Sequence, residues 1–85
     1  MAAQVAGPRR RAAIAAAATR LSPQLRIRVA ERAWTVAERT GRVTVCRTFG
    51  DLLEALGRSG VPRAVAEPDL LDAAAAITRD LLRST

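Results

Sequence analysis

Arginine is the residue type on which most of the possible chemistry of this sequence rests. All fourteen basic residues of the 85-residue chain are arginines, and the net charge is +6. Residues 1–48 carry a charge of +8, whereas residues 49–85 carry −2. Positive charge concentrated in one part of a chain is typical of a protein with an anionic partner. We expect that partner to be nucleic acid, DNA rather than RNA. A basic surface that contacts only solvent is the alternative interpretation.

A helix-turn-helix at residues 35–56 would present several of these arginines to a DNA groove. Arginine can bond guanine through two hydrogen bonds, and threonine can reach a base edge or a phosphate. The arginine run near the start of the chain could reach phosphates or a minor groove. The candidate nucleic-acid ligands are Arg9, Arg10, Arg11, Arg28, Arg32, Arg39, Arg42, Thr44, Arg47 and Thr48.

Two phrases of the sequence support this interpretation through a resemblance. TVAERTG at 35–41 and TVCRTFG at 44–50 resemble the helix-turn-helix of TetR-type repressors, and residues 9–21 resemble their first helix. The resemblance covers about half of the chain and implies DNA binding in transcription regulation. This sequence departs from the family in a turn about two residues shorter. It also has polar residues or glycine where apolar ones are usual, at Arg42, Arg47 and Gly50. The alternative to a helix-turn-helix is that Gly41 only ends a helix, which then packs against the next helix.

Enzyme chemistry has few candidates in this sequence. The single cysteine, Cys46, lies between Arg42 and Arg47, which could lower the pKa of its thiol. Without histidine, however, the chain lacks a partner base for a nucleophile and the usual ligands of a zinc site. The segment 57–60 lacks the Lys-Ser/Thr ending of a phosphate-binding loop. We therefore expect Cys46 to be a buried apolar residue, and the protein to be a non-enzyme without metal or cofactor.

The start of the chain does not predict export. The arginines at 9–11 precede an apolar stretch at 12–18, but this stretch is nearly all alanine and ends at Thr19 and Arg20. It is too short and too weakly apolar for a signal peptide. No apolar run approaches the roughly 18 residues that a membrane span needs. We expect a cytoplasmic protein that does not bind membranes.

Helical signals predict an all-α fold, a small bundle of about four helices with alanine-rich interfaces. Residues 1–8 are expected to be a flexible N-terminal arm, and residues 9–85 a single helical domain. The expected helices are 9–21, 23–40 with Ser22 as N-cap and Gly41 as terminator, 49–56 capped by Thr48, and 68–83. Alternation of Val43 and Val45 with polar residues leaves 42–47 open between a turn and a short strand.

The hydrophobic residues predict a thin core. They make up 49% of the chain, but nineteen of them are alanines, which bury little surface. A thin core often needs a partner chain to complete its burial. The alternative function is therefore a protein–protein interaction module: a homodimer, an antitoxin-like protein or a small subunit of a larger assembly. Trp34, beside Ile27 near the edge of the apolar face, is the candidate interface anchor, with a place in the core as the alternative.

Overall fold

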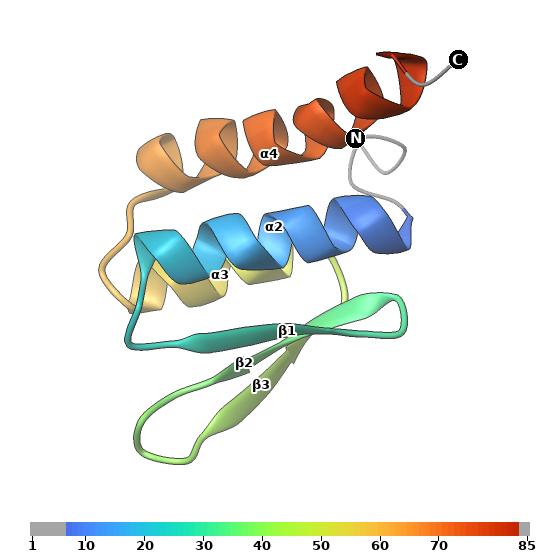
Figure 1. The fold of residues 1–85 in the computed structure, drawn as a ribbon. Coiled ribbons are helices and arrows are strands. Elements are labelled where there is room, and N and C mark those ends of the chain that lie inside the picture. The colour runs from blue at the N-terminus through green and yellow to red at the C-terminus, as the bar shows by residue number, and fades with distance from the viewer. Residues whose placement is uncertain (1–6, 84–85) are drawn as a thin grey trace.

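The computed structural model describes residues 7–83 and shows an α+β fold (Figure 1). Within these residues three helices accompany one three-stranded antiparallel sheet with strand order β1-β2-β3. The elements are, in chain order, α2 (Pro8–Leu21), β1 (Arg26–Ala30), β2 (Ala33–Ala37), β3 (Val43–Cys46), α3 (Phe49–Arg58) and α4 (Arg63–Arg83). The predicted all-α bundle is therefore wrong. The expected flexible arm at 1–8 lies almost entirely outside the described residues.

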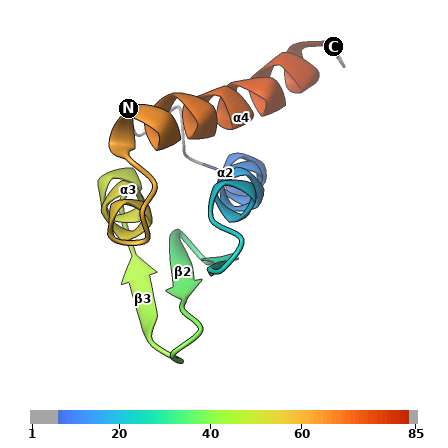
Figure 2. The same cartoon turned by 90° about the vertical axis from the view of Figure 1, so that its left-hand side faces the viewer.

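These elements form three layers. In Figures 1 and 2, α2 and α3 lie side by side between the sheet below them and α4 above them. Helix α2 contacts β1, β2 and α4, and α3 contacts β3 and α4. The sheet therefore has an inner face covered by two helices. No described element covers its outer face.

The largest correction concerns residues 23–40, which form a β-hairpin and not a helix. In the hairpin, Ile27 pairs with Val36 and Val29 pairs with Trp34, so all four side chains lie on the inner face. Placed on a helix, the apolar residues of this segment would spread over roughly 200°, twice the width of an ordinary apolar stripe. In strands the same residues share one face because side chains alternate with a period of two. Burial of a single face, together with β-branched residues, explains the strands.

The helix-turn-helix predicted at 35–56 is also wrong. This segment contains most of β2, the loop to β3, β3 itself and most of α3. Gly41 has a φ of +92° in the β2–β3 loop, where glycine adopts this conformation without strain, and it does not end a helix. The short strand that was the alternative for residues 42–47 is the observed structure, and β3 pairs with β2. The likeness of these phrases to TetR-type repressors therefore does not extend to the fold.

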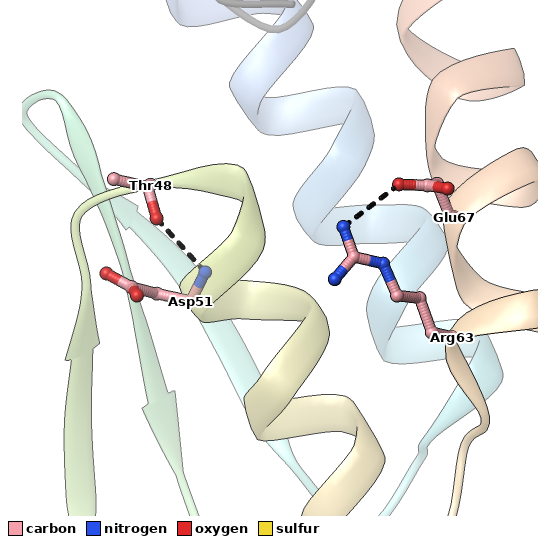
Figure 3. A network of polar contacts seen from close by, with 4 residues as sticks. All are labelled: Thr48, Asp51, Arg63 and Glu67. Carbon is pink, nitrogen blue, oxygen red and sulfur yellow. Dashed lines mark hydrogen bonds and ion pairs between the residues drawn. The ribbon is translucent and has the colours of Figure 1, made fainter.

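Some other local signals were interpreted correctly, whereas the predicted N-cap role of Ser22 and the predicted start of the last helix were wrong. Helices α2 and α3 lie where they were expected, and Thr48 caps α3 by accepting a hydrogen bond from the main-chain N–H of Asp51 at 3.1 Å (Figure 3). Ser22 ends α2 instead of starting a helix, because its N–H donates to the Ala18 carbonyl at 3.0 Å. Helix α4 begins at Arg63, five residues before the predicted start, and contains Pro68.

The core lies at the level of α2 and α3, between the sheet and α4. Alanines of α2 and α4 let these two helices pack closely, while leucines of α3 fill the space beside them. The fully buried large side chains of this core include Ile14, Leu52, Leu53, Leu56, Leu70 and Cys46. Among the described residues, no helix combines the length and apolarity needed to cross a membrane.

Candidate nucleic-acid interface

The outer face of the sheet carries three arginines around a strip of small side chains. The strand register defines this outer sheet face, because side chains opposite one another across the strands point to the same side. Arg28 on β1 is opposite Thr35 on β2, and Thr35 is opposite Val45 on β3. The next row follows the same order, with arginine on β1, alanine on β2 and valine on β3. The outer sheet face thus comprises Arg26, Arg28, Ala30, Ala33, Thr35, Ala37, Val43 and Val45, and Arg47 directly after β3.

This face is open to solvent although it contains apolar residues. Val43 and Val45 are 59% and 53% exposed. The middle strand contributes only alanines and a threonine, so the centre of the face is low. Arginines stand on both edges, and two strand spacings separate those edges by about 10 Å. None of the outward-facing strand residues is acidic.

An open hollow lies at the hairpin end of the outer sheet face. Arg32 from the β1–β2 loop and Arg47 from the end of β3 both line it. Small and apolar side chains and one carboxylate, that of Glu31, complete its lining. Its lining residues are Ala30, Glu31, Arg32, Ala33, Thr35, Val45 and Arg47. Two guanidinium groups and one carboxylate therefore line this hollow, which leaves it with a net positive charge.

More arginines surround the β2–β3 loop at the opposite end of the sheet. The loop is closed by two hydrogen bonds, from the Glu38 N–H to the Arg42 carbonyl at 2.8 Å and from the Gly41 N–H to the Glu38 carbonyl at 2.9 Å. Arg42 Nε is 4.0 Å from Glu38 Oε2, a weak and exposed ion pair. Arg39 lines a second hollow together with Arg26 and Arg28 of β1. Positive charge thus extends along the whole length of the sheet.

The structure brings five of the predicted ligands to this face or its loops. They are Arg28, Arg32, Arg39, Arg42 and Arg47, all exposed. Arg26 was not among the predicted ligands, although its alternation with Ile27 and Arg28 is the strand signal that would have found it. Once the hairpin is known, the register adds Arg26 to the site.

The other predicted ligands lie elsewhere. Arg9, Arg10 and Arg11 are in the first turn of α2, on the covered side of the sheet; Nε and Nη2 of Arg10 donate to Thr78 Oγ1 at 3.0 and 2.8 Å. Thr44 lies opposite Val36, on the inner side of the sheet. Thr48 is the cap of α3 described above.

The two predicted interface anchors are core residues in this chain. Trp34 is 2% exposed, and Ile27 is also buried. Both side chains face α2 from the inner side of the sheet. Any interface of the folded protein must therefore use other side chains.

Cys46 is buried at the end of β3 and is not an activated thiol. Burial raises the pKa of this thiol, the negative charge of Asp51 raises it further, and Arg58 opposes them weakly. The nearby Arg42 and Arg47, which the sequence suggested would lower this pKa, are exposed to solvent. A buried neutral thiol serves as a small apolar side chain. Within residues 7–83, no group of three or more metal-ligating side chains is close enough to hold an ion.

Comparison with known proteins adds no family to this description. No protein family matches the chain, and neither the curated proteins nor the solved structures include a significant match.

Proposed function

We propose that the protein binds double-stranded nucleic acid, DNA in preference to RNA, through the outer sheet face, and that it is a non-enzymatic regulatory protein. The observation that carries the proposal is the strand register. It gathers arginines from both edges of the sheet onto the one face that no described element covers. Phosphates would be bound by the edge arginines and the loops, and these contacts would position the duplex.

A duplex is favoured over a single strand because the face has no aromatic side chain. Proteins that bind single strands stack bases on exposed aromatic rings. The chain has one Trp, one Phe and no Tyr, and both Trp34 and Phe49 are buried. The outer sheet face therefore offers charge and shape but no stacking platform.

DNA is favoured over RNA by the shape of the hairpin. The major groove of B-DNA, about 12 Å wide, admits a two-stranded β-ribbon, whereas that of an RNA duplex is deep and narrow. The β1–β2 hairpin is such a ribbon, joined by only two residues, Glu31 and Arg32. Its small outward residues allow close approach to base edges. The edge arginines would then bind phosphates, and we expect Val45, on the neighbouring strand β3, to contact a thymine methyl group.

Loss of two edge arginines tests the proposal. In fluorescence anisotropy titrations with short DNA duplexes, Arg28→Ala/Arg47→Ala should bind more weakly than the wild type. Its slope of log K against log salt should be shallower by about 1.8, because each lost phosphate contact removes about 0.9. Single-stranded DNA and duplex RNA should bind the wild type less tightly than duplex DNA does.

The matched control is Arg63→Ala/Arg83→Ala, which removes the same charge from α4, on the far side of the helical layer (Figures 1 and 2). Arg63 only forms an exposed ion pair with Glu67 at 3.3 Å (Figure 3), so its loss should not unfold the protein. An equal loss of affinity in both double variants would indicate attraction by net charge alone. Absence of duplex binding by the wild type at low salt would refute the proposal.

We also place this activity in the cytoplasm. Cys46 forms no disulfide, as is usual for cysteines of proteins in a reducing compartment. Imaging of a tagged full-length chain tests this location, and a signal confined to the cell envelope would contradict it.

A further inference from the structure

Helix α4 has a second side that the fold leaves partly uncovered. Ala66, Leu70 and Ala74 are its buried side, which packs on α2 and α3. Beside them runs a row of residues at helical spacings of three and four, which we call the α4 stripe: Leu71, Asp72, Ala75, Thr78, Arg79 and Leu82. An open groove follows most of this stripe, with Arg10 of α2 as its other wall.

The α4 stripe is mostly accessible. Asp72, Ala75 and Arg79 are exposed, and Leu82 is 71% exposed. Leu71 and Thr78 form its half-buried edge, next to α2. An exposed apolar and charged row on a long helix is a surface of the kind that helix pairs bury.

The α4 stripe carries one acid and one base, on either side of its small central residue Ala75. Asp72 lies three residues before Ala75, and Arg79 lies four residues after it. Among the residues described, neither side chain has an ion-pair partner in its own chain; the ion pairs of α4 are Arg63–Glu67 and Arg83–Asp80. The midpoint between Asp72 and Arg79 falls between Ala75 and Ala76, so a copy of the stripe reversed about that point places each acid opposite a base.

We propose that the α4 stripe binds the α4 stripe of a second copy of this chain, with the two helices antiparallel and the two-fold axis near Ala75. A two-fold axis makes each contact occur twice, so Asp72 of each copy faces Arg79 of the other. Because Ala75 at the centre is small, the two helix axes can approach to about 8–10 Å, the usual distance between packed helices. Leu71 and Leu82 then become covered on both sides of the axis.

A second copy fits this surface better than a nucleic acid does. One acid and one base leave the α4 stripe without the excess positive charge that a polyanion requires. The stripe is also separated from the outer sheet face by the layer of α2 and α3 (Figure 2). The inference is therefore independent of the proposed function, and a dimer of this kind leaves the outer sheet face of each copy accessible.

Charge reversal in the absence of nucleic acid tests the inference. Sedimentation equilibrium should show a mass that rises with concentration from 9.1 kDa towards twice that value. Asp72→Arg and Arg79→Asp should each raise the dimer dissociation constant by about tenfold or more, because two attractive pairs become two repulsive ones. Asp72→Arg combined with Arg79→Asp should restore dimerisation. The two single variants change the net charge in opposite directions, so a common loss cannot come from net charge.

The matched control is Asp69→Arg, an exposed aspartate of the same helix that lies off the stripe and should leave the dimer unchanged. A chain that stays monomeric up to millimolar concentration overturns the proposal and leaves the stripe to a different protein. Single variants that dimerise like the wild type, or a combined variant that is not restored, also overturn it.

Cross-linking gives a second readout that does not depend on charge. In a Cys46→Ser background, Ala75→Cys should form a disulfide-linked dimer under mild oxidation, because a residue near the two-fold axis meets its own copy. Ala30→Cys on the sheet should not. Cross-linking through Ala30→Cys alone would place the contact on the sheet and overturn the proposal.

Discussion

The indole Nε1 of Trp34 donates a hydrogen bond to the main-chain carbonyl of Arg11 at 3.0 Å. Trp34 lies in the middle strand, and Arg11 lies in the first turns of α2, so this bond joins the sheet to the helix above it. A buried indole N–H without a partner is costly, and here it is paired inside the core. The bond therefore helps to hold the inner face of the sheet against α2.

Replacing this tryptophan should destabilise the fold. In Trp34→Phe the Arg11 carbonyl loses its donor and the smaller ring leaves space, so the free energy of unfolding should fall by about 1–3 kcal/mol. Urea denaturation followed by circular dichroism measures the change. Because Trp34 is the single tryptophan, wild-type fluorescence should shift to longer wavelength in the same transition. A variant as stable as the wild type would contradict the structural role given to this hydrogen bond.

The buried thiol of Cys46 should make stability fall at alkaline pH. Its folded-state pKa is raised above the ordinary value of 9.0, chiefly by burial and then by Asp51. The unfolded chain therefore loses this proton first as the pH rises, so the stability contribution is complete below pH 9.0 and is lost progressively up to the folded-state pKa. The chain has no lysine, tyrosine or histidine, so Cys46 is the side chain to which a loss of stability in this window is assigned.

Unfolding free energies at about pH 7 and about pH 10 measure this effect. The wild type should lose stability between the two values, and Cys46→Ala should lose less because it has no thiol to titrate. The thiol of the folded wild type should also react slowly with a disulfide reagent at neutral pH and quickly in denaturant. Equal pH dependence in the two proteins would contradict the burial-raised pKa.

The β1–β2 loop contains a residue with a strained backbone, and a substitution can relieve this strain. Glu31 has a φ of +56°, and it is the one non-glycine residue of the described chain with positive φ. Two-residue hairpin loops with positive φ at the first position favour glycine there. Glu31→Gly should therefore raise the free energy of unfolding by about 1 kcal/mol. Arg32→Gly, at the neighbouring position with ordinary φ, should not stabilise the protein in the same thermal unfolding experiment, and stabilisation by both would point to removal of side chains in general.

Thr48 should matter for the stability of α3. Its hydroxyl accepts the Asp51 N–H at the start of that helix. Thr48→Ala should lower the free energy of unfolding by about 1 kcal/mol. Thr48→Ser keeps the hydroxyl and should therefore be nearly as stable as the wild type. Both variants should bind duplex DNA as the wild type does once folded. Weaker DNA binding by folded Thr48→Ala would return this residue to the interface.

Local sequence signals predicted α2, α3 and the Thr48 cap, because these depend on neighbours within a few residues. Alanine and arginine favour a helix throughout 8–21, and the spacing of Phe49, Leu52, Leu53 and Leu56 fits one face of a helix. Residues 26–46 were different. Each of their strands needs a partner strand, and local sequence patterns do not show which segment that is. Val36, for example, fits both a helix and a strand until its pairing with Ile27 is known.

The candidate interface divides in the same way. The sequence alone determined that the basic charge lies in the first half of the chain and that no histidine accompanies it. That both aromatic side chains are buried was decided by the tertiary structure. Only the tertiary structure decided which arginines act together, because strand pairing places Arg28 and Arg47 on opposite edges of one face and leaves Arg11 above the other. The physical reason is that charge is a property of each residue, whereas a binding face is created by hydrogen bonds between strands distant in sequence.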